Sequence, residues 1–127
     1  MKISHFGGVV ECKTIEELKN VLNMRYGDEV NEFWISGEEE NPCLAILVNK
    51  GYATLTYFPE DGHMGFQSVG MDTDLEADGI SVFYTNTPEE EMEINNDAII
   101  PFSKALGAII EFFETMHLPK SIEWVEM

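Results

Sequence analysis

Two segments of the chain repeat apolar residues at the three- and four-residue spacing of an amphipathic helix. Residues 13–27, "KTIEELKNVLNMRYG", open with Thr14 and Glu17 at the spacing of a capping box, and Gly27 is placed to end the helix. Residues 101–117, "PFSKALGAIIEFFETMH", are followed by Pro119. The predicted inward faces are Ile15, Leu18, Val21, Leu22 and Met24 or Tyr26 in the first helix, and Phe102, Ala105, Leu106, Ile109, Phe113 and Met116 in the second.

The remaining apolar segments are rich in β-branched and aromatic residues, which favours strands. Lys50-Gly51 predicts a tight hairpin between two of these segments. Short acidic runs between strands favour solvent, so residues 38–40 and 88–93 are predicted loops. The pattern predicts one α+β domain, residues 1–127, in which two helices pack on an antiparallel meander of five or six strands. The expected strands are residues 30–36, 43–49, 52–58, 65–71, 80–86 and a short piece in 121–127.

The net charge restricts the partners of the protein. Asp and Glu number 24 and Lys and Arg number 7, giving a formal charge of -17. Nucleic acid and anionic lipid would repel such a surface, so we expect neither as a partner. The charge suits either solubility or steering toward a basic protein. No apolar run approaches the roughly 20 residues that cross a bilayer, and the N-terminus lacks a signal-peptide core, which predicts a cytoplasmic protein.

The segment "YFPEDGHMGFQSVG", residues 57–70, has the composition of a long hairpin connection. Pro59 cannot donate to a strand ladder, and the glycines allow unusual backbone angles at the tip. Glu60, Asp61 and His63 are therefore expected on a solvent-exposed loop, with Phe58 and Phe66 anchoring its base. Such a loop is an ordinary turn, a recognition loop, or the acid/base and metal-ligand set of a small hydrolase.

The other candidate metal-binding and catalytic motifs do not have the residue spacing that such sites require. "DTDLEADGI" starts like a calcium loop, but Thr85 stands where the bidentate Glu belongs and a strand is predicted where a helix is needed. The histidines are far apart, and no Cys-x-x-Cys, phosphate-binding or nucleophile-elbow pattern occurs. We expect no metal and no cofactor. Cys12 and Cys43 are predicted to be reduced, partly buried thiols.

Three stretches together resemble the first numbered family of immunity proteins from bacterial polymorphic-toxin systems. They are "LAILVNKGYATLTYFPEDGHMGFQSVG", "IIPFSKALGAIIEFF" and "LPKSIEW", and the resemblance extends over roughly residues 30 to 126. In that family an aromatic-Phe-Pro run leads into Gly-Phe-x-Ser-x-Gly, and a helix ending in Glu-Phe-Phe precedes a terminal Trp. The positions that match are Phe58, Pro59, Gly65, Phe66, Ser68, Gly70 and Trp124. From its type alone, Trp124 is expected to be a packed residue.

The resemblance implies a non-enzymatic antidote that binds a cognate toxin domain, often a deaminase-fold toxin acting on nucleic acid, as a monomer in a one-to-one complex. A toxin with a basic cleft would attract an acidic antidote. Tyr57, Phe66 and Trp34 are candidate aromatic anchors. A metal-assisted hydrolase using residues 59–66, or an acidic adaptor, remains the alternative. The residues expected to face the partner are Glu60, Asp61, His63, Phe66, Asp72, Asp74, Glu76 and Asp78.

Overall fold

The computed structural model describes residues 1–70 and 72–127, and within them the α+β class is confirmed. Eight of the described strands form one antiparallel sheet in the spatial order β10-β6-β5-β4-β3-β1-β2, with β9 beside β5. A separate hairpin joins β7 and β8. The sheet strands are β1 (Lys2–His5), β2 (Gly8–Glu11), β3 (Val30–Ser36), β4 (Cys43–Asn49), β5 (Tyr52–Phe58), β6 (Phe66–Val69), β9 (Ile100–Pro101) and β10 (Glu123–Glu126). The other elements are α1 (Ile15–Leu22), β7 (Ile80–Tyr84), β8 (Glu91–Asn95), a 3-10 turn (Asn96–Ala98) and α2 (Phe102–Thr115).

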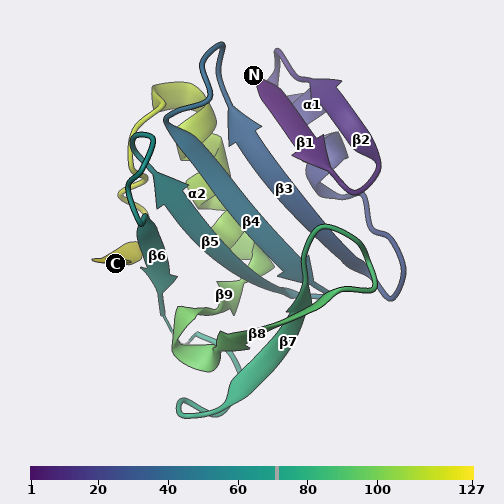
Figure 1. Ribbon diagram of the computed structural model, residues 1–127, viewed down its shortest axis with the longest axis vertical. Helices are drawn as coiled ribbons and strands as arrows, with labels where there is room; N and C mark the ends of the chain where they lie inside the picture. The colour runs from purple at the N-terminus through teal and green to yellow at the C-terminus, as the bar shows by residue number, and fades with distance from the viewer. Residues whose placement is uncertain (71) are drawn as a thin grey trace.

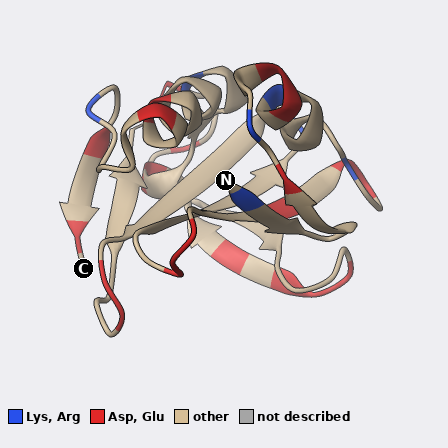
Figure 2. Cartoon of the chain, turned by 90° about the horizontal axis from the view of Figure 1, so that it is seen from above, with Lys and Arg blue, Asp and Glu red and all other residues tan. Residues whose placement is uncertain are grey.

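The elements form three layers. In Figure 1 the two helices lie behind the sheet and the β7–β8 hairpin crosses in front of its lower end, and the same order is visible from above in Figure 2. The main core lies between helices and sheet and includes the fully buried Phe33, Leu55 and Phe112. A smaller core of Leu47, Phe83 and Ile99 lies between the sheet and the hairpin. The sheet therefore has a helical face and a second face that the hairpin covers only in part.

The central strands have the predicted bounds, and the edges of the fold include more strands than were predicted. β3, β4 and β5 have the predicted bounds, and Asn49 pairs with Tyr52 across Lys50-Gly51. The expected strands in 65–71, 80–86 and 121–127 are also present as β6, β7 and β10, although Met71 lies outside the described residues. Strands β1, β2, β8 and β9 were not predicted.

The prediction of a loop over residues 88–93 is wrong in its second half, because β8 begins at Glu91. Glu91 and Glu93 are exposed on this strand, so its charges remain in water while its backbone pairs with β7. An edge strand tolerates outward charges, which makes an acidic run compatible with β structure. The other acidic run, residues 38–40, is a loop as predicted.

Helix α1 ends at Leu22, five residues before the predicted stop at Gly27. The Arg25 guanidinium donates to the carbonyl oxygens of Leu22 at 2.6 Å and Met24 at 2.9 Å. Tyr26 then pairs with Val30 through two backbone hydrogen bonds. A basic side chain that satisfies the last helical carbonyls lets the chain turn early into β3.

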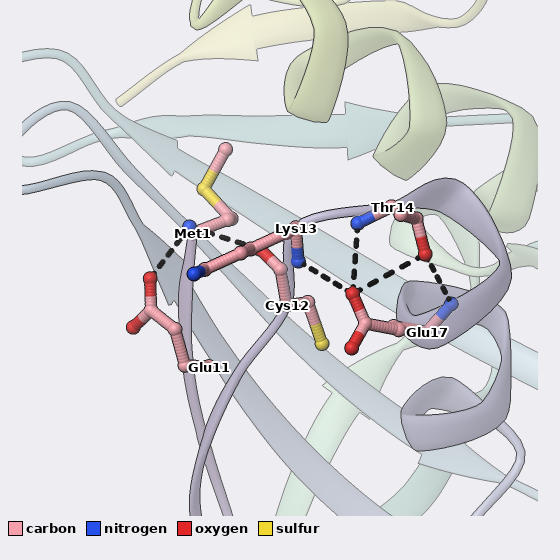
Figure 3. A network of polar contacts seen from close by, with 6 residues as sticks. All are labelled: Met1, Glu11, Cys12, Lys13, Thr14 and Glu17. Carbon is pink, nitrogen blue, oxygen red and sulfur yellow. Dashed lines mark hydrogen bonds and ion pairs between the residues drawn. The ribbon is translucent and has the colours of Figure 1, made fainter.

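The predicted capping box of α1 is confirmed (Figure 3). The Thr14 hydroxyl accepts from the Glu17 backbone N–H at 3.1 Å, and Glu17 Oε1 accepts from the Thr14 N–H at 3.1 Å. The Lys13 N–H donates to the same carboxylate oxygen at 2.9 Å and, with Thr14, holds the pKa of Glu17 below its ordinary value. Because the folded pKa is lowered, this contribution is present at neutral pH and is lost as the pH falls through that pKa.

We expect Thr14→Ala to lower the free energy of unfolding by about 1 kcal/mol, because the Glu17 N–H loses its acceptor. Urea unfolding followed by circular dichroism measures the change. Thr14→Ser keeps the hydroxyl and is the matched control, which should stay close to the wild type. Equal stability of the Ala and Ser variants would show that the cap contributes nothing.

Helix α2 is rotated relative to the predicted face. Its fully buried residues are Ala105, Ala108, Ile109 and Phe112. The predicted Phe102, Leu106, Phe113 and Met116 are only partly buried and flank this stripe. The helix exists as predicted, but its innermost aromatic residue is Phe112 and not Phe113.

Among the described residues, Cys12 and Cys43 are both free thiols, the first buried and the second half-buried. Burial raises the pKa of each thiol. No helix within the described part of the chain is both long and apolar enough to cross a membrane.

Candidate partner-binding surface

The loop between β5 and β6 has the predicted architecture. β5 ends at Phe58, directly before Pro59, and Gly62 and Gly65 have φ angles of 83° and 99°. A Cβ at Gly65 would also lie 2.9 Å from the Thr56 side chain, so this position requires glycine. Glu60 and Asp61 are exposed at the tip. The structure thus presents two carboxylates to solvent on a constrained turn.

His63 belongs to the support of this loop and is not presented to solvent as the sequence suggested. Its side chain is only 19% exposed. Nδ1 accepts from the Gly65 N–H at 2.8 Å, Nε2 lies 3.0 Å from Glu126 Oε2, and the ring stacks on Phe66 at 5.3 Å. Phe66 in turn packs against the main core, which confirms its predicted place at the base of the loop. His63 and Phe66 therefore hold Glu60 and Asp61 in position.

The second predicted acidic segment, residues 72–78, is a series of turns that leads into β7. Asp72, Asp74, Glu76 and Asp78 are all exposed. Asp72 forms an ion pair with Lys104, and Asp74 accepts a hydrogen bond from the Tyr52 hydroxyl, which raises the pKa of Tyr52. As predicted, a strand follows the glycine of this segment. Within residues 1–70 and 72–127, no group of three or more His, Cys, Asp or Glu is arranged to hold a metal ion.

The two acidic segments are tied to different elements. The β5–β6 loop is held to β10 through His63 and Glu126, whereas residues 72–78 are held to β5 and α2 through Tyr52 and Lys104. The sequence prediction treated them as one partner-facing set. In the structure they are two separately anchored acidic segments.

The aromatic feature that the sequence did not locate is a stacked pair on the open face of the sheet. The rings of Trp34 and Phe58 lie 5.9 Å apart with an interplanar angle of 13°, and Trp34 is 42% exposed. Ala45, the register partner of Trp34 on β4, leaves room for the indole to lie toward Phe58. Exposed aromatic side chains of this kind are frequent anchors in protein interfaces.

Tyr57, another predicted anchor, is on the opposite face. It is 7% exposed and meets Phe112 edge-on at 6.0 Å between ring centroids. Successive residues of a strand point to opposite faces, so Phe58 and Tyr57 cannot both be partner-facing. Of the three aromatic candidates, Trp34 alone is substantially exposed, because Phe66 supports the loop and Tyr57 belongs to the core.

The open face is hollowed on both sides of Trp34. A cavity of about 180 Å³ lies between Trp34, Phe58 and the β8 residues Met92 and Ile94. Trp34 also lines a cavity of about 140 Å³ that includes Glu40. Ile94 and Gln67, which line the 180 Å³ cavity, also border a third cavity of about 360 Å³. We call these three contiguous hollows the open-face groove; its middle part is lined by Glu32, Trp34, Ala45, Leu47, Thr54, Thr56, Phe58, Gln67, Thr85, Met92 and Ile94.

The two acidic segments and the β7–β8 hairpin carry carboxylates and no Lys or Arg. No Lys or Arg occurs between Lys50 and Lys104, although this stretch includes both acidic segments and the whole β7–β8 hairpin. Figure 2 shows the consequence: the hairpin layer carries acidic residues and no basic ones. The middle and the hairpin end of the open-face groove are therefore bordered by carboxylates, and among the described residues Lys2 is the one basic residue that lines it, in the hollow with Glu40.

Trp124, by contrast, is a packing residue, as expected from its type. Its Nε1 donates to the Pro119 carbonyl at 2.7 Å, and its ring lies against the main core. This contact joins β10 to the segment that follows α2.

A small α+β protein with an acidic hairpin side and an exposed aromatic groove is, by these features, a protein-interaction module. The chain belongs to the immunity protein family Imm1, whose family model matches residues 7–126, and it is a toxin-neutralising immunity protein. It is also similar, at 26% identity over an alignment of 128 positions that covers all of both chains, to a double-stranded DNA deaminase immunity protein of Burkholderia cenocepacia (strain H111). The family suggested by the sequence motifs is confirmed.

Proposed function

We propose that this immunity protein binds and occludes a cognate deaminase toxin domain in the cytoplasm, as a single domain in a one-to-one complex and without catalysis of its own. The observation that carries the proposal is the acidic hairpin side of the sheet, where residues 51–103 include no Lys or Arg. A toxin that acts on nucleic acid needs a basic cleft, and an acidic surface is attracted to such a cleft and competes there with phosphates. The name of the Burkholderia relative supports a deaminase as the toxin class.

The geometry of the loop favours binding over hydrolysis. The hydrolase alternative needs His63 beside Glu60 and Asp61, but both ring nitrogens of His63 are engaged by Gly65 and Glu126. In our proposal the exposed carboxylates steer the toxin, while His63 and Phe66 position the loop. The steering residues are Glu60, Asp61, Asp72, Asp74, Glu76 and Asp78.

The proposal is tested with the cognate toxin domain, captured first by pull-down. We expect Glu60→Lys with Asp61→Lys to slow association by about tenfold at low salt, because long-range attraction is weakened. Asn and Gln replacements within residues 72–78 should act in the same direction. Added salt should reduce the difference, since screening limits the attraction to about 8–10 Å near physiological ionic strength. Stopped-flow association rates against salt concentration provide the measurement.

The matched control reverses two exposed carboxylates on the helical layer, Glu16→Lys with Glu114→Lys, which changes the net charge equally. Its association rate should fall less than that of the loop variant. Failure to capture any toxin domain would contradict the proposed function and favour an acidic adaptor. Equal, salt-independent rates for all variants would show that the acidic face serves solubility only.

A further inference from the structure

Glu32 is a buried carboxylate without a cationic partner. It lies on β3 at the end of the open-face groove and is 9% exposed. Its oxygens accept from the Thr85 hydroxyl at 2.6 Å and the Asn86 N–H at 3.0 Å, both neutral donors. None of the ion pairs formed among the described residues includes Glu32. A carboxylate offers about four acceptor sites, and buried charges are normally paired, so this group is set to receive a cation.

The walls of the groove define the shape of that cation. Trp34 is two residues from Glu32 on the same face of β3, and its ring is held parallel to Phe58. Met92 and Ile94 form an apolar wall opposite. The middle cavity, about 180 Å³, equals the liquid volume of about six water molecules, which is room for one long side chain. A planar cation on an apolar stem can stack on the Trp34 ring, pack against the apolar wall and pair with the Glu32 carboxylate at the same time.

We infer that the open-face groove receives an arginine side chain of the toxin, whose guanidinium pairs with Glu32 and lies on the ring of Trp34. Arginine fits better than lysine, because its planar guanidinium stacks on aromatic rings and is less strongly hydrated. Its methylene stem contacts Met92 and Ile94 in the same way that long basic side chains cover apolar surfaces elsewhere. This inference rests on the proposed function, and it specifies the part of the surface that holds the toxin.

The residues at the two ends of the groove indicate that it holds a longer segment of the toxin and not a single side chain. Glu40 and Lys2 line the hollow on one side of Trp34, and Glu93 and Asp97 line the hollow beyond Ile94. A central stretch with an apolar wall and with carboxylates alone at the hairpin end complements an extended basic loop whose arginine reaches the middle of the groove. The peripheral acidic segments then set the rate of encounter, and the groove sets the lifetime of the complex.

The test measures the affinity of the captured toxin domain for Glu32→Gln and Trp34→Ala. We expect each substitution to raise Kd by about 30-fold or more, mainly through faster dissociation, because a desolvated charge pair or an interface anchor is lost. The matched controls on the helical side are Glu114→Gln and Met24→Ala; Met24 is 40% exposed, close to the exposure of Trp34. Both controls should bind as the wild type does. Thermal unfolding of every variant shows whether the fold is kept.

A second readout does not depend on these substitutions. With Trp124→Phe, Trp34 is the sole tryptophan, and we expect its fluorescence to shift to shorter wavelength on toxin binding. Unchanged Kd for both groove variants, with toxin still captured, would overturn the inference and leave the proposed function standing. Loss of binding in Trp34→Ala but not in Glu32→Gln would show that the groove receives an apolar side chain, and it would overturn the assignment of arginine as the occupant. Concentration-dependent self-association abolished by Trp34→Ala would identify a second copy of this chain instead.

Discussion

Replacing Phe112 by alanine is expected to lower the free energy of unfolding by about 3–5 kcal/mol. The side chain is fully buried on α2, and its ring meets Tyr57 of β5 at an interplanar angle of 74°. The substitution removes an aromatic side chain from the contact between helix and sheet and leaves a cavity that the surrounding core fills only in part. Urea unfolding monitored by circular dichroism measures the loss.

Phe113→Ala is the control, because it removes the same atoms one position away. Phe113 is only partly buried, so we expect a clearly smaller loss of stability. A loss for Phe113→Ala equal to or above that for Phe112→Ala would mean that α2 packs with the face predicted from sequence, and that the rotation described above is wrong.

The orientation of α2 shows what a single sequence can and cannot predict. The apolar spacing and Pro119 were enough to predict the helix. Phe112 and Phe113 are adjacent and chemically identical, so local pattern alone cannot decide which one is innermost. That choice is made by the sheet, where Tyr57 and Leu55 form the surface onto which the helix packs. It depends on contacts between residues far apart in the chain.

The strands also divide into those that the sequence predicts and those that depend on tertiary contacts. β3, β4 and β5 are long, rich in β-branched and aromatic residues, and joined in part by a two-residue turn, so their bounds were predictable. β1, β2 and β9 have two to four residues each, and their pairing with a neighbour decides that they are strands. β8 is acidic and has a strand conformation because β7 lies beside it. Short strands with weak intrinsic preference are defined by tertiary context.

The candidate site was predictable only for its acidic loops. Pro59 and the two glycines predicted the exposed carboxylates of Glu60 and Asp61. The middle of the open-face groove was not predictable, because it exists only where the β7–β8 hairpin lies over part of the sheet. Glu32 looks like an ordinary strand glutamate in the sequence; its burial follows from Thr85 and Asn86, more than fifty residues away.

The hairpin is therefore the element on which the middle of the groove depends, and Phe83 is the residue that attaches the hairpin to the sheet. Phe83 is 1% exposed and packs with Leu47 of β4 and Ile99 in the smaller core. A hydrogen bond from Asn49 Nδ2 to the Val82 carbonyl, 2.9 Å long, is a further link to the sheet. Apart from this bond and those of Glu32, apolar contact dominates the attachment, so removing the aromatic ring should weaken it most.

Phe83→Ala is expected to lower the free energy of unfolding by about 3–5 kcal/mol and, in the protein that stays folded, to increase hydrogen exchange of the β7 and β8 amides above that of β4 and β5. Val82→Ala is the control from the outer face of the same strand, since Val82 is 37% exposed and its backbone contact to Asn49 is unaffected. Because the hairpin forms one wall of the groove, Phe83→Ala should also weaken toxin binding even under conditions where the main core is intact. Unchanged exchange in β7 and β8 would contradict the assignment of Phe83 as the anchor. Faster exchange there with unchanged toxin affinity would show that the toxin is held by the sheet itself, independently of the hairpin wall.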